Sequence, residues 1–240
     1  MNKYLSLFFL YNRASHNKIL LLAGAVPLFF FLIFFIRVGS IGRAGSYMLM
    51  ERAFDGIWAV LLFIIVLVLA LMAVANSLNG RKSLKISKTT TGYTIRRLRI
   101  SPLSSYFMTF FYLLSVIIIL WGVAIASLYL IGKLGLMMAD SSDIETKLAL
   151  GLLRTEIGHA LIPIAHPAVL TFNIAAVVAL AAECARSCYL RWHNGTPSVG
   201  VVIVIIPMFL VWAYSPNNSY ILMAILVVVL YALLSIADII

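Results

Sequence analysis

The stretch IWAVLLFIIVLVLALMAVA, residues 57–75, decides the fold class of this chain, because none of its 19 residues is charged. A helix that crosses the hydrocarbon core of a lipid bilayer needs about 20 consecutive apolar residues. Membrane-spanning β-strands instead alternate apolar and polar residues over about ten positions. The stretch therefore predicts a transmembrane α-helix.

Five further apolar runs have a similar length, so the sequence predicts six transmembrane helices. The predicted spans are residues 19–36, 57–75, 106–131, about 160–182, 199–214 and 220–237. In the fourth span, Pro163 and Pro167 are expected to kink or break the helix near its outer end. The chain has no internal repeat and no low-complexity linker. Residues 1–240 are therefore expected to form one all-α polytopic membrane domain.

The composition excludes a soluble domain. Of the 240 residues, 63% are hydrophobic and 11% are charged, whereas an ordinary soluble domain is about 45–50% apolar and about 25% charged. A monomer with so few ionic groups would not stay dissolved in water. A soluble enzyme and a disordered chain are both excluded.

The positive charges predict how the spans are oriented. If the amino terminus is cytoplasmic, 12 of the 18 lysines and arginines fall on the cytoplasmic side, together with the whole net charge of +10. Basic residues are retained on that side of a membrane. We therefore expect a multi-pass protein of the cell (plasma) membrane with both termini in the cytoplasm. A nucleic-acid partner is not expected.

The first 17 residues precede the first span and allow two interpretations. Their apolar residues follow Lys3 and are succeeded by Asn12 and Arg13, where a signal peptide would have a small-residue cleavage site. We expect an amphipathic helix at the inner membrane interface, with Tyr4, Phe8 and Tyr11 as interfacial aromatic residues. The alternative is a simple extension of the first span.

The cytoplasmic connection between the second and third spans is the most informative segment for function. Residues 76–105 read NSLNGRKSLKISKTTTGYTIRRLRISPLSS and carry seven positive charges. Residues 93–100 suit a short basic helix. Ser101 and Pro102 then have the character of an N-cap and of the first residue of the next helix. The charges alone would also suit an anchor to anionic lipid headgroups.

The residue order in GYTIRRLRISPLSS, residues 92–105, resembles the loop motif of ABC-2 type exporter permeases, roughly Gly-Thr-Leu-Glu-Arg-Leu-x-x-(Ser/Thr)-Pro-Leu-Ser. In that family the segment forms a coupling helix that sits in a groove of the ATPase subunit. The resemblance implies a coupling segment over residues 92–104. Its expected contact residues are Tyr93, Ile95, Arg96, Arg97, Leu98, Arg99, Ser101, Pro102 and Leu103. Two features depart from the pattern: Arg96 replaces an acidic residue, and Tyr93 separates the glycine from the threonine.

The resemblance further implies a permease subunit of an ATP-binding cassette exporter. The chain contains no G-x-x-x-x-G-K-(S/T) phosphate loop, so ATP and Mg²⁺ are expected on a separate nucleotide-binding subunit and no cofactor on this chain. A second permease chain, as homodimer or heterodimer, is the other expected partner. Many family members carry a re-entrant excursion between the last two spans, but here that connection is only SPNNS. This departure favours a peptide, drug or lipid-like substrate.

Polar residues in and beside the spans are the candidates for a transport pathway. His166 and Asn173 are separated by seven residues, which places them on one face of a helix. Either they face the pathway, or they hydrogen-bond neighbouring helices. Glu183 and Arg186 are expected to form a local ion pair.

No metal site is expected from the sequence. Cys184 and Cys188 lie four residues apart, but a zinc ion would need two more ligands and His193 could supply only one. We expect both thiols to be reduced and unreactive in the cytoplasm.

Two other classes of function compete with the exporter interpretation. An ATP-independent channel or secondary carrier would typically show more buried charge or repeat symmetry between halves. An intramembrane enzyme would need a convergent set of catalytic groups, and the chain has neither an HExxH nor a GxSxG motif. A transport subunit without catalytic residues of its own is therefore the leading expectation.

Overall fold

The computed structural model of the chain describes residues 3–39, 53–54, 56–78, 100–138, 143–163, 166–192, 200–214 and 218–237. Every regular element in these ranges is an α-helix. The helices are α1 (Lys3–Gly39), α3 (Ile57–Leu78), α5 (Pro102–Met138), α6 (Ile144–Arg154), α7 (Glu156–Leu161), α8 (Pro167–Trp192), α9 (Val201–Tyr214) and α10 (Asn218–Ala237).

Five of the described helices are long and apolar enough to cross a membrane: α1, α3, α5, α8 and α10. These five confirm the prediction of a multi-pass α-helical membrane protein. The fifth predicted span, residues 199–214, forms α9, which has only 14 residues. At 1.5 Å per residue, α9 is about 21 Å long, whereas the hydrocarbon core is about 30 Å thick. Five of the six predicted spans therefore have the required length.

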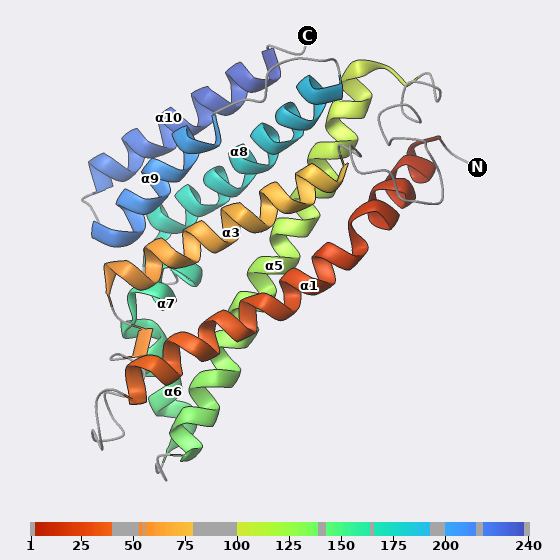
Figure 1. Cartoon of the computed structure of the whole chain (residues 1–240). Coiled ribbons are helices and arrows are strands. Elements are labelled where there is room, and N and C mark those ends of the chain that lie inside the picture. The colour runs from red at the N-terminus through yellow and green to blue at the C-terminus, as the bar shows by residue number, and fades with distance from the viewer. Residues whose placement is uncertain are drawn as a thin grey trace.

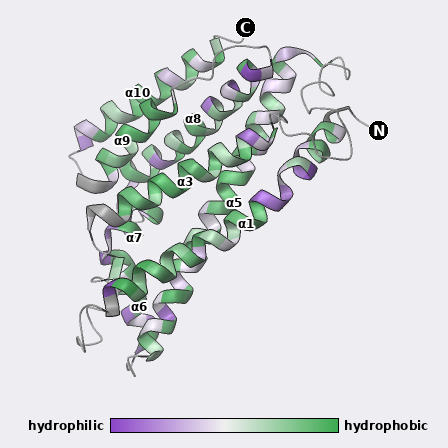
Figure 2. Ribbon diagram, viewed as in Figure 1, coloured by the Kyte–Doolittle hydropathy of each residue, from purple (hydrophilic) through white to green (hydrophobic). Residues whose placement is uncertain are grey.

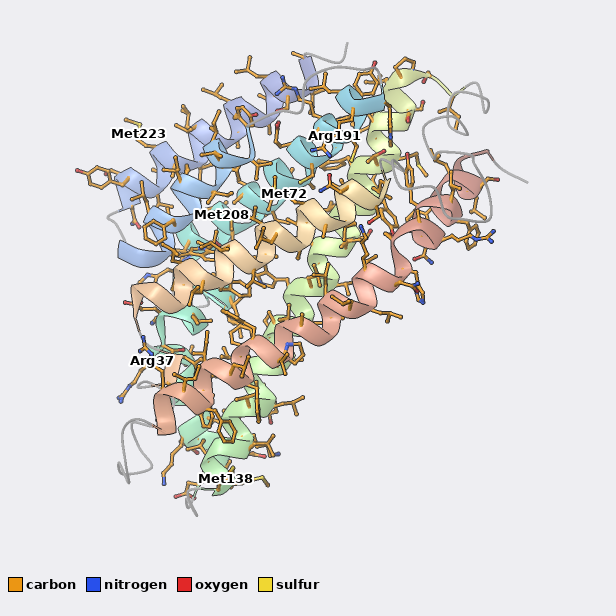
Figure 3. All side chains as sticks on the ribbon, in the orientation of Figure 1. Arg37, Met72, Met138, Arg191, Met208 and Met223 are labelled. Atoms are coloured by element: carbon orange, nitrogen blue, oxygen red, sulfur yellow. The ribbon has the colours of Figure 1, made fainter. Side chains whose placement is uncertain are left out.

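The long helices run side by side, with α1 and α5 in one direction and α3, α8 and α10 in the opposite direction (Figure 1). As a result, α1 and α5 begin, and α3, α8 and α10 end, at the same end of the bundle, which we call the N/C end. Figure 3 labels Arg191 near this end and Arg37 and Met138 at the opposite end. Helix α8 is central, because it packs against α3, α5, α9 and α10. Helix α5 joins it to α1.

Helix α1 is continuous, so the first 17 residues do not form the separate interfacial helix that the sequence predicted. Leu7, Tyr11 and Ser15 are fully buried and follow one another at intervals of four residues on the face turned to α5. The Tyr11 hydroxyl lies 3.0 Å from Oγ1 of Thr109, and the Ser15 hydroxyl bonds that of Tyr112. Tyr11 is thus a packing residue between two helices. The alternative interpretation, an extension of the first span, describes α1.

The fourth predicted span is divided by its prolines, as expected. Helix α7 ends at Leu161 and α8 begins at Pro167, where proline fits because the first residues of a helix need no N–H bond. Helix α8 then continues ten residues beyond the predicted end at residue 182. The break places α7 and the start of α8 at the end opposite to the N/C end (Figure 1).

Most of the outer surface of the long helices is apolar. Figure 2 shows hydrophobic residues along the middle of α3, α9 and α10, with hydrophilic residues in the first half of α1 and around α6. Leu28 and Phe31 of α1 and Leu222 and Met223 of α10 are exposed large side chains. Continuous apolar surface of this extent is suited to lipid or to another membrane helix.

Candidate functional site

Only the last part of the predicted coupling segment lies in the described residues. Tyr93, Ile95, Arg96, Arg97, Leu98 and Arg99 lie outside them. Ser101, Pro102 and Leu103 are described, and all three are exposed at the N/C end.

The start of α5 agrees with the prediction made from the sequence. The Ser104 amide donates to the Ser101 hydroxyl over 3.3 Å, and Pro102 is the first helical residue. A serine cap satisfies one of the backbone donors that every helix leaves unpaired at its start. Helix α5 therefore begins with a capped first turn at Ser101 and Pro102.

Two basic side chains tie neighbouring helices together near the N/C end. Lys18 of α1 donates to the Ala73 carbonyl of α3 over 3.1 Å. Arg191 near the end of α8 donates to the side-chain oxygen of Asn76 in α3. Both bonds are solvent-exposed in the bundle. They link α1, α3 and α8 near the end of the bundle at which α3 ends and α5 begins.

Glu183 of α8 is the fully buried carboxylate of this end. Arg186 lies 3.5 Å from its Oε2 atom, which confirms the predicted local ion pair. The Ser235 hydroxyl of α10 also donates to Oε2, over 3.0 Å. Buried charge at membrane depth is costly and needs such partners. The hydrogen bond from Ser235 therefore fastens α10 to α8.

Asn173 in α8 is also buried, and its side chain forms hydrogen bonds beside the break between α7 and α8. Its side-chain amide donates to the Ala160 carbonyl at the end of α7 over 2.7 Å. Its Oδ1 accepts a hydrogen bond from Nε1 of Trp212 in α9 over 2.8 Å. Trp121 of α5 donates to the neighbouring Leu161 carbonyl over 3.2 Å. These donors satisfy carbonyl groups that the end of α7 leaves without helical partners.

A small pocket of about 50 Å³ lies beside this break. It is lined by His159 and Ala160 of α7, Pro163 and His166 of the connector, Val169 of α8, and Val211 and Trp212 of α9. The ring centroids of the two histidines are 6.1 Å apart. Burial, and secondarily the nearby His166, lowers the pKa of His159 from its ordinary value of 6.5. This favours the neutral imidazole at pH 7.

Aromatic side chains support the wall of this pocket. The Trp212 ring stacks on Phe63 of α3, with centroids 6.2 Å apart. It also meets Trp121 edge-to-face, with centroids 5.7 Å apart. Aromatic pairs in such arrangements add to the energy of area burial. The wall is therefore held by three different helices.

The structure separates the two residues that the sequence assigned to the pathway. His166 precedes α8 and is exposed at the pocket, while Asn173 is buried and does not line it. The alternative interpretation, hydrogen bonding to neighbouring helices, describes Asn173. The pocket instead contains His159 and Trp212, which the sequence did not assign to it. The signal in the sequence that could have pointed to His159 is its position seven residues before His166, with Pro163 between them.

Comparison of the chain with family models, curated proteins and solved structures found no match. The structure therefore shows a multi-pass α-helical membrane protein with a small pocket, lined by two histidines, at the end opposite to the N/C end.

Proposed function

We propose that the chain is the permease subunit of an ATP-binding cassette exporter, with ATP hydrolysed on a separate subunit. The observation that carries the proposal is the order of residues 92–104, which continues directly into the capped first turn of α5. A partner that moves the basic segment would move the start of α5 with it. The length and packing of α5 determine how far along the bundle such a movement would travel.

Helix α5 suits the transmission of such a movement. It has 37 residues and is therefore about 55 Å long, so it reaches from the N/C end to the opposite end. Along this length it packs against α1 and α8. Packed helices move as rigid bodies rather than bending freely. A tilt of α5 at the N/C end would thus displace α8 and the pocket beside its first turn.

The proposal includes a second permease chain and a peptide, drug or lipid-like substrate. The pocket beside the proline break, of about 50 Å³, is too small for such a substrate. Two chains that pair through exposed apolar helix faces would enclose more space. In this proposal the protein lies in the plasma membrane with both termini in the cytoplasm, because basic residues are retained on the cytoplasmic side and most of them lie in the segments on the same side as the termini.

The test uses the tagged chain purified from the membranes of its own host. In the test variant, Arg97→Glu is combined with Leu98→Asp. In the matched control, Lys85→Glu is combined with Leu84→Asp, which makes the same chemical changes in the same connection but outside the motif.

We expect an ATPase with its own phosphate-binding loop to co-purify with the wild type and the control, and to be lost from the test variant. Equal loss from both variants would identify a general charge effect, such as lipid anchoring, and would refute the coupling segment. Retention in both variants, or the absence of any such ATPase from the wild-type preparation, would also refute it.

A secondary carrier is the second candidate, because Glu183 is a fully buried carboxylate inside a candidate span. Ion-coupled carriers use such groups to bind protons or cations. Glu183→Gln keeps the shape of the side chain and removes its charge. In a carrier this change abolishes ion-driven uptake into vesicles that lack ATP. In an exporter subunit it leaves association with the ATPase intact.

A further inference from the structure

The pocket beside the proline break brings together two imidazoles from different elements. His159 belongs to α7, and His166 belongs to the connector that precedes α8. Their ring centroids are 6.1 Å apart and their planes are tilted by 47°. Both side chains line the same pocket. The two ring systems therefore converge on one small volume at the surface of the bundle.

The distance between the rings suits a shared metal ion. A ring nitrogen lies about 1 Å from its ring centre and a zinc–imidazole bond is about 2 Å long, so two coordinating rings have centres up to roughly 6 Å apart. The observed separation lies at this limit. That limit corresponds to a linear arrangement of the two nitrogens about the ion, whereas a tetrahedral angle places the ring centres about 5 Å apart. The ring of the exposed His166 would therefore have to move about 1 Å closer to His159 to complete a tetrahedral site.

The nitrogens of both rings are available in the described part of the chain. Neither side chain makes a hydrogen bond or an ion pair there; the contact between the two rings is their side-chain interaction. Metal-binding histidines must be neutral, because the coordinating nitrogen uses its lone pair. Burial already favours the neutral form of His159, as described above.

We propose that His159 and His166 bind a divalent first-row transition-metal ion in this pocket. Imidazole ligands suit copper, nickel and zinc ions, and not calcium or magnesium ions, which prefer oxygen. The pocket of about 50 Å³ has room for water on the remaining coordination positions, since about 10–15 Å³ of such space is enough to hold one water. With two protein ligands the site is open and exchangeable. The bound ion would join the end of α7 to the start of α8 across the break.

Trp212 provides the measurement, because its indole lines the same pocket. Bound Cu²⁺ quenches nearby tryptophan fluorescence. The chain is purified with a tag that contains no histidine, placed in lipid nanodiscs and titrated with CuCl₂. We expect saturable quenching by one ion per chain. Zn²⁺ and Ni²⁺, followed by calorimetry, should compete for the same site.

His159→Gln and His166→Gln should each weaken Cu²⁺ binding at least about tenfold, because each removes one of two protein ligands. The matched control is His16→Gln, since His16 is an exposed histidine of α1 outside the pocket. His193→Gln is a second control. Both controls should bind Cu²⁺ like the wild type.

Quenching that does not saturate, or that survives both pocket substitutions, would overturn the proposal, as would its loss in either control. Circular dichroism and gel filtration establish that each variant is folded. His166 is exposed, so His166→Gln decides the result if His159→Gln does not fold. The titration requires no ATPase partner. Its failure is therefore distinguishable from failure of the proposed exporter function.

Discussion

Replacing Asn173 by leucine tests whether this residue holds the broken helix or lines a transport pathway. Leucine has the same number of side-chain heavy atoms as asparagine and is somewhat larger, so the substitution leaves no cavity, but it can neither donate nor accept a hydrogen bond. Two buried bonds disappear: the one to the Ala160 carbonyl, at 2.7 Å, and the one from Trp212, at 2.8 Å. Asn173 is 5% exposed and Trp212 is 4% exposed, so water does not readily replace either partner.

The expected cost follows from the two bonds. A side-chain hydrogen bond between membrane helices contributes about 0.6 kcal/mol on average and about 1.7 kcal/mol at most. Two bonds at these limits predict that Asn173→Leu lowers the free energy of unfolding by about 1–3 kcal/mol. In water the same orphaned groups would cost more, about 1–3 kcal/mol each. The membrane value is smaller because the unfolded helices still find partners in the bilayer.

The assay is unfolding in mixed detergent micelles followed by far-ultraviolet circular dichroism, since the fluorescence of Trp212 itself would change. The matched control is Thr171→Val in the same helix. The side chain of Thr171 is exposed, and among the described residues its hydroxyl bonds only the Pro167 carbonyl of its own helix, at 2.6 Å. This control should change stability by less than about 0.5 kcal/mol.

A double-mutant cycle with Trp212→Phe isolates the bond between the two side chains. We expect a coupling of about 1 kcal/mol, because each single substitution removes the same bond. The reasoning is refuted if Asn173→Leu is as stable as the wild type, or if Thr171→Val is equally destabilising. Unchanged stability together with altered transport would restore Asn173 to the pathway.

Three further predictions concern the ends and turns of the helices. Gly158→Ala should destabilise the protein by about 1–3 kcal/mol, because the new methyl group would lie 1.7 Å from a backbone oxygen of α6; Gly122→Ala, which meets nothing within 4 Å, should instead be neutral or stabilising in the same unfolding assay. Ser101→Ala should cost about 1 kcal/mol through loss of the cap to Ser104, and unchanged amide exchange in the first turn of α5 would contradict this. Folding lowers the pKa of His159 from 6.5, so the unfolded chain binds the proton more tightly than the folded chain. The contribution of His159 to stability is therefore complete above pH 6.5 and is lost as the pH falls through the lowered pKa. Between about pH 8 and pH 5 the thermal unfolding temperature should fall less in His159→Gln than in the wild type, and an equal fall would exclude His159 as its cause.

The features that were predictable from the chain are those in which a segment needs little from its neighbours. A helix such as residues 57–75 satisfies its own backbone hydrogen bonds in lipid, so its apolar length is sufficient to predict it. The capped start of α5 and the pair of Glu183 with Arg186 depend on groups three residues apart. The proline break is equally local. These predictions hold because the interacting groups are close along the chain.

The course of α1 and the content of the pocket depend on contacts between distant segments. The sequence predicted an interfacial helix before the first span, yet Asn12 and Arg13 lie on the exposed face of a continuous helix whose opposite face packs on α5. Polarity along one segment does not show which face a neighbour will cover. Trp212 reaches the pocket from α9 and bonds Asn173, 39 residues earlier. Membrane insertion could be inferred from the sequence, because each apolar helix satisfies its own backbone hydrogen bonds. The partners of His159, Asn173 and Trp212 could not be inferred, because only the packing of the helices brings these distant groups together.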